Sequence, residues 1–297
     1  MKKVLTAALF AAFAVVRPAF ADDASVVYAK MPAHPALWTV HGSKGTVYLF
    51  GSVHLLPPQV DWHTKEIDAA IARSDILVFE IALDADAQQR MQAYIQAHGM
   101  LPAGQHLHDM ISPEARKELD VEVKKLPVSP EAVDRMRPWL AALTIEIMGI
   151  TKEHYSAASG VDQQLQANAN GKPIVGLETV EQQLSLLAPE NPKIELQAFE
   201  AGLKTSTESN DQVGPLLDAW MHGRVDRIAS LTTKELAKFP DARKLLFDDR
   251  NKAWAGKIMR YLDRPKVYFI TVGAGHLAGP GGVPTLLRAK GFRVDGP

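Results

Sequence analysis

Four short apolar runs, rich in β-branched and aromatic residues, constrain the fold of this chain more than any other feature. They are TVYLF (46–50), ILVFEI (76–81), KPIVGLE (172–178) and KVYFITV (266–272). Each run is almost continuously apolar, which is typical of strands covered on both faces, and long stretches with helical periodicity separate them. The pattern predicts an α/β fold with a mainly parallel central sheet flanked by helices.

The stretch between the second and third runs carries helix signals and no convincing strand. Ser112 and Ser129 are each followed by Pro and Glu, the sequence of a helix cap, a first helical residue and an early acidic residue. We therefore expect a helical insertion over about residues 85–160, packed on the sheet within a single domain of residues 22–297. Further helices are predicted at residues 162–168, 180–187, 215–222, 243–261 and 283–290.

The first residues have the pattern of a secretory signal peptide. Lys2 and Lys3 precede the apolar stretch VLTAALFAAFAVV, and AFA (19–21) offers the small residues that a signal peptidase accepts. We expect residues 1–21 to be removed by cleavage after Ala21, and the mature protein to be periplasmic or secreted. The apolar stretch, about 13 residues, is shorter than the roughly 20 that span a bilayer. An uncleaved anchor is the alternative, and no stable membrane span is expected after cleavage.

Charge and cysteine content narrow the function. Three of the 33 basic residues lie in residues 1–21, which leaves 30 against 34 acidic residues in the mature chain. This balance gives no indication of nucleic-acid binding. Because the chain has no cysteine, it has no disulfide and no thiolate nucleophile, and His, Asp, Glu or Asn must hold any metal.

Two of the predicted strands end in the pattern Gly-x-x-His. The tetrapeptide GSVH ends at His54, and GAGH ends at His276; two other strands end at Glu80 and Glu178. Because ligands of open α/β sheets bind beyond the carboxyl ends of the strands, these side chains are expected at one edge of the sheet. They could hold a divalent metal through His54, His276 and Glu80, with a carboxylate as general base. Mn, Co or Zn would suit these ligands.

Each of these residues also has a structural interpretation. Either histidine could be a turn residue bonded to the backbone, and either glutamate could cap the helix that follows it. For Glu178, a helix cap and a place behind the site remain equal alternatives. We interpret Asp162 as a helix cap in preference to an acid that orients a histidine, and the HLHD sequence (106–109) as a surface turn.

Several longer stretches resemble one known family. GTVYLFGSVHLLP, DILVFEI, MRPWLAALTIE, DDRNKAWAGKI and VGAGHLAGPGGVPTLLRAKGFRV occur in the order found in the TraB/PrgY/GumN family, from about Trp38 to the end of the chain. That family is similar to the Tiki metalloproteases, which are membrane-associated and cleave amino-terminal segments of Wnt proteins. It is related more distantly to erythromycin-esterase-like and haem-binding ChaN-like proteins. The resemblance implies an α/β fold of this kind.

The resemblance also implies roles for particular residues. The two Gly-x-x-His units match the paired motif expected to hold metal, and Glu80 matches the acidic position after the second strand. Arg250 and Asn251 match an Arg-Asn pair that the family places near the site. Family members often have Glu before this pair, whereas this chain has Asp249, so any role that depends on the longer side chain is in doubt. Without the resemblance, Arg250 would be interpreted as part of a surface ion pair and Asn251 as a solvated helix residue.

The resulting hypothesis is a periplasmic metal-dependent hydrolase, most simply a metallopeptidase acting on a peptide or related amide. Its catalytic residues would be Glu80, Arg250, Asn251 and Glu178, with Arg250 or Asn251 stabilising the developing negative charge. The alternative is a protein that binds a peptide, haem or polysaccharide precursor without turning it over. The oligomeric state is not predicted.

Overall fold

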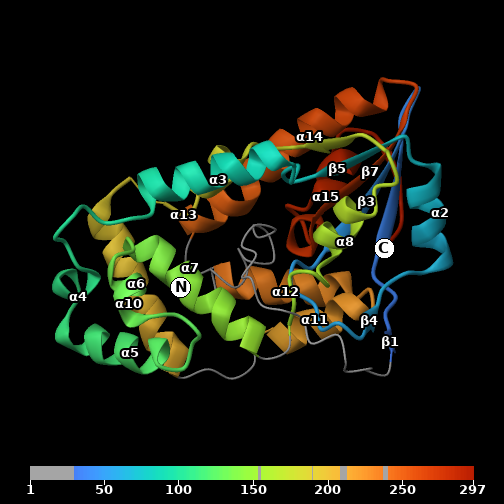
Figure 1. The fold of residues 1–297 in the computed structure, drawn as a ribbon. Helices are drawn as coiled ribbons and strands as arrows, with labels where there is room; N and C mark the ends of the chain where they lie inside the picture. Colours follow the sequence, from blue (N-terminus) through green and yellow to red (C-terminus); the bar gives the residue numbers. More distant parts are fainter. Residues whose placement is uncertain (1–29, 153–154, 189, 208–212, 237–239) are drawn as a thin grey trace.

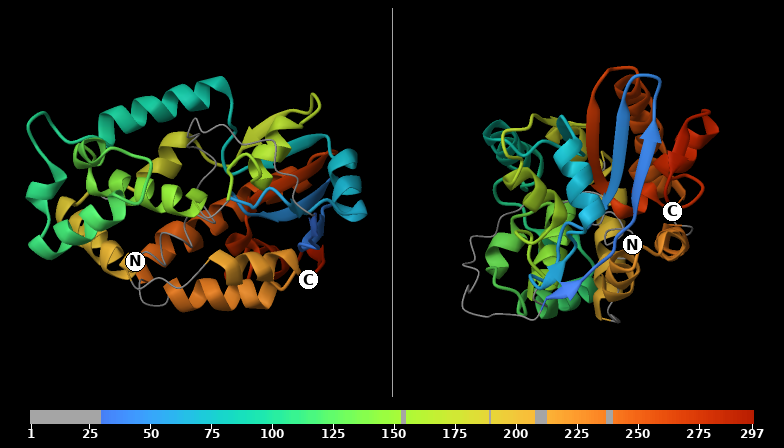
Figure 2. Two further views of the ribbon diagram at one scale, coloured as in Figure 1. Left: turned by 60° about the horizontal axis from the view of Figure 1, so that its bottom comes forward. Right: turned by 90° about the vertical axis from the view of Figure 1, so that its right-hand side faces the viewer.

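The protein has a sheet at one end and a group of helices at the other (Figure 1). The computed structural model describes residues 30–152, 155–188, 190–207, 213–236 and 240–297, so the predicted signal peptide lies outside the described residues. Figure 2 shows the same two parts from two further directions. No helix within the described ranges has the length and apolar character needed to cross a bilayer.

A six-stranded sheet with the order β6-β5-β7-β3-β2-β8 forms the first part. The four predicted strands are its parallel members: β3 (Thr46–Ser52), β5 (Ile76–Phe79), β6 (Ile174–Gly176) and β7 (Val267–Gly273). The predicted α/β class and the mainly parallel sheet are therefore confirmed.

Two antiparallel strands complete the sheet, and the sequence analysis did not identify them. Strand β2 (Leu37–His41) pairs with β3 across a tight turn, in which the Gly42 amide donates to the Gly45 carbonyl at 2.9 Å. Strand β8 (Arg293–Asp295) pairs with β2 and has only three residues, too few for a reliable periodicity. A separate two-stranded ladder joins β1 (Met31–Pro32) to β4 (Val60–Asp61).

Helices cover both faces of the sheet, as the continuous apolar strands predict. On one face, Phe50 and Phe269 are fully buried in a cluster with residues of α2 (Lys65–Arg73), α8 (Val161–Ala167) and α11 (Val213–Met221). The aromatic rings at its centre pack at centroid distances of 5.6 to 6.4 Å and include those of Trp62 and Trp220.

The opposite face packs against two helices from the carboxyl-terminal part of the chain. Helix α14 (Asp249–Leu262) buries Trp254, Ile258 and Leu262 against the sheet, and α15 (Val283–Ala289) adds Leu287. Because α14 runs along the sheet, its first turn lies at the carboxyl ends of the strands.

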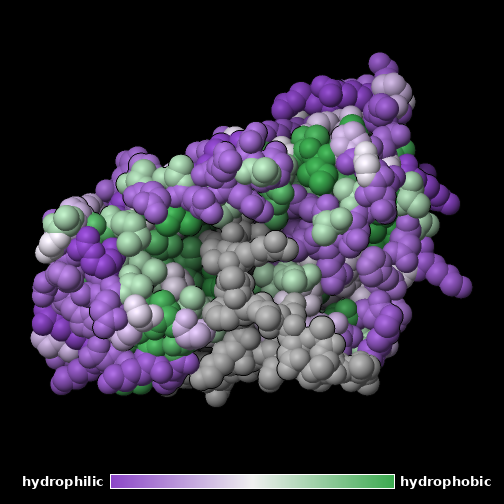
Figure 3. Space-filling view, in the orientation of Figure 1, coloured by the Kyte–Doolittle hydropathy of each residue, from purple (hydrophilic) through white to green (hydrophobic). Residues whose placement is uncertain are grey.

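The helical part has its own apolar core, and we call it the helical lobe. It contains α3 (Ala85–His98), α4 (Leu107–Met110), α5 (Pro113–Val123), α6 (Pro130–Asp134) and α7 (Pro138–Lys152). Helix α10 (Pro192–Thr207), from outside the predicted insertion, contributes Phe199 and Leu203 to the same core. The outer surface of α3 is mostly hydrophilic, and hydrophobic surface gathers beside it on the side toward α7 (Figure 3). The remaining helical segments are α9 (Val180–Ser185), α12 (Val225–Leu236) and α13 (Pro240–Arg243).

The prediction that the HLHD sequence is a surface turn is wrong: it forms the start of helix α4 and lies at a partly exposed junction of three helices of the lobe. Asp134 accepts hydrogen bonds from the backbone and Nδ1 of His108 at 2.8 and 2.7 Å, and it contacts Nδ1 of His106 at 2.8 Å. His108 Nε2 contacts Asp120 at 2.9 Å. Both ring nitrogens of His108 therefore face carboxylates, an arrangement that suits the protonated imidazole.

We predict that this junction stabilises the fold more at low pH than at high pH. Burial lowers the pKa of His108, but the hydrogen bonds and charges of Asp120 and Asp134 outweigh this effect and raise it. The stabilisation is present below the unfolded pKa, about 6.5, and is lost as the pH rises through the folded pKa. Urea unfolding should show His108→Gln costing about 0.5–1 kcal/mol near pH 5.5. The cost should be smaller near pH 8.5, and equal costs at both pH values would contradict the assignment.

Candidate functional site

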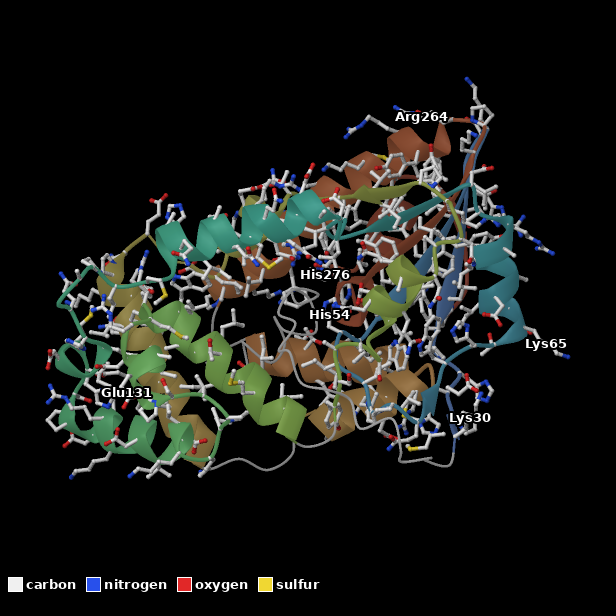
Figure 4. The ribbon with its side chains drawn as sticks, in the orientation of Figure 1. Lys30, His54, Lys65, Glu131, Arg264 and His276 are labelled. Atoms are coloured by element: carbon white, nitrogen blue, oxygen red, sulfur yellow. The ribbon has the colours of Figure 1, made fainter. Side chains whose placement is uncertain are left out.

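The two histidine motifs meet at the carboxyl edge of the sheet. Ser52, at the end of β3, pairs with Gly273, at the end of β7, so His54 and His276 follow neighbouring strand ends. A short 3₁₀ helix, Ala274–Leu277, carries His276. Figure 4 shows both histidines at the edge of the sheet that faces the helical lobe. Both side chains are buried.

The motif glycines permit close packing at this edge. A Cβ on Gly51 would lie 3.0 Å from the Cα of Ala274, and one on Gly275 would lie 3.1 Å from the ring of Phe247. Neither glycine has a positive φ. The glycines are therefore explained by the close approach of neighbouring atoms, together with the strand-end turn expected from the sequence. They are not explained by a left-handed backbone conformation.

His54 is oriented by a carboxylate. Its Nδ1 lies 2.5 Å from Oδ2 of Asp162, and both side chains are buried. Asp162 lies in the first turn of α8, but the cap residue is Gly160 and the helix has no side-chain cap bond. The preferred interpretation of Asp162 as a helix cap is wrong, and the alternative, an acid that orients a histidine, is correct.

The other nitrogen of His54, Nε2, is buried. Within the part of the chain that the structure describes, buried Nε2 has no hydrogen-bond partner. Burial lowers the pKa of His54, but the charge and hydrogen bond of Asp162, with a smaller effect of Glu80, raise it above its usual value overall. A ring fixed at Nδ1 presents its Nε2 in a defined direction.

His276 has a different environment. Its Nδ1 lies 2.6 Å from Oδ1 of Asn251, and its Nε2 lies 3.2 Å from Nη1 of Arg250. Because an amide oxygen only accepts and a guanidinium only donates, Nδ1 carries the proton and Nε2 accepts. Burial, followed by the charges of Arg250 and His54, holds the pKa of His276 well below its usual value. Phe247 stacks on the ring at a centroid distance of 4.6 Å.

Asn251 is fully engaged in holding His276. Its Nδ2 donates to the carbonyl of Gly281 at 2.9 Å, while its Oδ1 accepts from the imidazole. The sequence-based hypothesis gave Asn251 a catalytic role in stabilising developing charge. The observed contacts show that Asn251 fixes the ring and the tautomer of His276, and its catalytic role stays a prediction.

Arg250 connects the two carboxylates of the site. Its Nη2 donates to Glu80 at 2.6 Å, and its Nε and Nη2 donate to the two oxygens of Glu178, each at 2.8 Å. The paired bonds to Glu178 have the two-point geometry that fixes the plane of a guanidinium. The guanidinium also lies 4.6 Å from the ring centroid of Trp254, in a cation–π contact.

The backbone brings Glu80 and Glu178 to the same place. Beyond the paired strands β5 and β6, the Glu178 amide donates to the Glu80 carbonyl at 2.7 Å. The cap of α9 is Thr179, so the interpretation of Glu178 as its cap does not hold and the alternative, a place in the site, does. Glu80 also accepts from Gln183 and from the Gly273 amide, both at 2.8 Å. Sequence reasoning missed Gln183, and no motif marks it.

A π-helical turn precedes the Arg250–Asn251 pair and contributes contacts to both Arg250 and His276. Residues Lys244–Asp248 form this turn, directly before α14. The turn presents the ring of Phe247 to His276 and the carbonyl of Leu246 to Nη1 of Arg250, at 3.3 Å. Such turns occur often at functional sites because they change the direction of neighbouring side chains.

We call these residues the strand-end cluster: His54, Glu80, Asp162, Glu178, Arg250, Asn251 and His276. The structure brings every predicted site residue into it. When both imidazoles are neutral and the three carboxylates are ionised, the cluster has a net negative charge, because it contains one guanidinium. This charge favours the binding of a cation. Yet in the described ranges no group of three or more His, Asp or Glu residues has the arrangement of a metal site. Both oxygens of Glu80 accept hydrogen bonds.

The fold and the cluster define an α/β protein with paired Gly-x-x-His strand ends beside a helical lobe. The chain belongs to the TraB/PrgY/gumN family, whose model matches residues 36–296.

Three relatives are similar to this chain over most of its length. An uncharacterized protein of Treponema pallidum (strain Nichols) is 22% identical over 275 residues, which cover 85% of this chain and 80% of that protein. The uncharacterized protein YbaP of Escherichia coli (strain K12) is 25% identical over 256 residues, with 81% and 87% covered. YbaP of Shigella flexneri matches with the same values.

Loss of the guanidinium should destabilise the protein strongly. Arg250→Ala would leave buried Glu80 and partly buried Glu178 without their cation, which costs about 3–5 kcal/mol. Arg90, whose exposed Nε lies 3.4 Å from Glu181, provides the control, and Arg90→Ala should cost less than about 1 kcal/mol. Urea unfolding measures both variants, and similar costs would contradict the assignment.

The two histidines should differ in titration. In chelator-treated protein, long-range ¹H–¹⁵N NMR should show His276 as the neutral tautomer protonated at Nδ1 between about pH 6 and 8, since its pKa is lowered. His54 should titrate above about pH 6.5, because Asp162 stabilises its protonated form. Identical titration of the two rings would contradict the contacts described here.

Proposed function

We propose that the protein is a periplasmic metal-dependent hydrolase that acts on a peptide or a related amide. The observation that carries this proposal is the pair of buried imidazoles on neighbouring strand ends, each held at Nδ1 by an oxygen of another side chain. The family relationship, through the resemblance of its motifs to those of metalloproteases, supports the same reaction class.

The donor groups suit a divalent cation at the histidines. Metal-bound imidazoles usually donate their second N–H to a carboxylate or another oxygen, as His54 does to Asp162 and His276 does to Asn251. His54 and His276 would therefore hold Mn, Co or Zn through Nε2. Glu80 remains the proposed third ligand, and it would take part only after a change in its contact with Arg250.

A bound divalent cation supplies Lewis acidity, which polarises a carbonyl and makes water a nucleophile at neutral pH. The protein's own groups would do the rest. As the alternative to its role as third ligand, Glu80 would act as general base: burial raises its pKa, against the opposing charges of Arg250 and His54, and a carboxylate with a raised pKa suits that role. Arg250 would stabilise negative charge on a carbonyl oxygen through Nη1 only after Nη1 leaves His276, because its other N–H groups donate to Glu80, Glu178 and the Leu246 carbonyl.

Metal binding and hydrolysis can be tested together. Protein exported to the periplasm should contain a divalent metal by mass spectrometry, and it should cleave members of a peptide library in a chelator-sensitive reaction. His54→Ala and His276→Ala should each reduce metal affinity by at least about tenfold, because each removes one ligand. His63→Ala is the matched control, since His63 contacts Asp68 on the surface at 2.6 Å.

Other outcomes of these experiments would contradict the ligand assignment or the enzymatic function. If both histidine variants fold normally and bind metal as tightly as the wild type, the ligand assignment is wrong. Binding of a peptide, haem or polysaccharide precursor without any product would replace the proposed enzyme with the sequestering protein considered from the sequence. If neither binding nor cleavage is found, both functions fail.

A further inference from the structure

We propose that Arg250 competes with the metal for its ligands, so that this residue sets the metal affinity of the site. The inference rests on the proposed metal-dependent function and goes beyond it. It concerns the two contacts that Arg250 makes with proposed ligands, His276 Nε2 at 3.2 Å and Glu80 Oε2 at 2.6 Å.

The contact with His276 makes the competition direct. A neutral imidazole protonated at Nδ1 has one electron pair available in the ring plane, at Nε2. That electron pair accepts the N–H of Arg250 Nη1. It cannot accept this hydrogen bond and coordinate a metal at the same time. The binding of a cation at His276 therefore requires Nη1 to withdraw.

The contact with Glu80 extends the competition to the proposed third ligand. Oε2 of Glu80 accepts from Arg250 and from Gln183, while Oε1 accepts from the Gly273 amide. Of these three donors, only Arg250 carries a positive charge. A divalent cation near Glu80 would be repelled by the guanidinium as well as excluded from the electron pairs that it occupies.

Glu178 keeps the guanidinium in this position. The two parallel bonds from Nε and Nη2 fix its plane, and the fixed plane directs Nη1 toward His276. A lysine ammonium is a point charge on a flexible stem and cannot reproduce this fork. Arg250→Lys therefore preserves the charge of the cluster while removing the geometry on which the competition depends.

Charge and competition can be separated with two variants that leave the net charge unchanged. Arg250→Lys is the first. The second is the double variant Arg250→Met with Glu178→Gln, which removes one cation and one anion. If only net charge mattered, both variants would bind metal as the wild type does. If Arg250 competes for the ligands, both should bind metal at least about tenfold more tightly, since hydrogen bonds to charged groups have net strengths sufficient for this change.

The experiment measures Mn²⁺ and Co²⁺ binding to chelator-treated protein by isothermal titration calorimetry, with the visible spectrum of Co²⁺ as a second readout. Circular dichroism establishes that each variant is folded, and Arg250→Lys serves if the double variant is not. The matched control is Arg137→Met with Glu195→Gln, a partly buried pair in the helical lobe joined at 2.6 Å, which should leave metal affinity unchanged.

The gain in affinity should also depend on His276. Adding His276→Ala to Arg250→Lys should abolish the gain if the freed electron pair causes it. Tight binding by the wild type with no gain in either variant would overturn the inference and leave the proposed function intact. Absence of binding in the wild type and in all variants would overturn both.

Discussion

The rest of the site depends on the hydrogen bonds and ion pairs that the guanidinium of Arg250 makes. The guanidinium is buried, it joins the carboxylates that follow β5 and β6, and it contacts the imidazole that follows β7. A buried carboxylate and a partly buried one at adjacent strand ends would repel each other and would lose hydration without compensation. Arg250 compensates both, and Trp254 supports it from the face of the sheet that α14 covers.

The stability of the cluster and its proposed function therefore both depend on Arg250. The same side chain that compensates buried Glu80 and partly buried Glu178 also occupies electron pairs that the proposed chemistry requires. Under the proposed metal binding, the cluster would have two ways to balance its negative charge, an internal cation that the chain provides and an external one that the solution provides. An arrangement of this kind can remain folded without metal, because the carboxylates never lack a partner.

The two imidazoles have similar motifs but are not equivalent. Asp162 stabilises the protonated form of His54, whereas Asn251 and Arg250 favour the neutral form of His276. The difference arises from helices α8 and α14, which lie on opposite faces of the sheet. The motif therefore determines where each ring lies, and the helix packed against it determines its proton affinity.

The sequence by itself determined the parallel strands, because short, continuous apolar runs rich in β-branched and aromatic residues are typical of strands covered on both faces. It also predicted that His54, His276, Glu80 and Glu178 lie at one edge of the sheet. It could not determine the partners of these residues. The partners of His54, Glu80 and His276 come from helical segments whose register against the sheet follows from packing, and no local pattern records that register; they are Asp162, Gln183 and Phe247. The packing of helix α10 in the helical lobe could not be predicted for the same reason. Tertiary structure alone decided which donor faces which acceptor, because a hydrogen bond depends on ångström distances between segments that are remote in the chain.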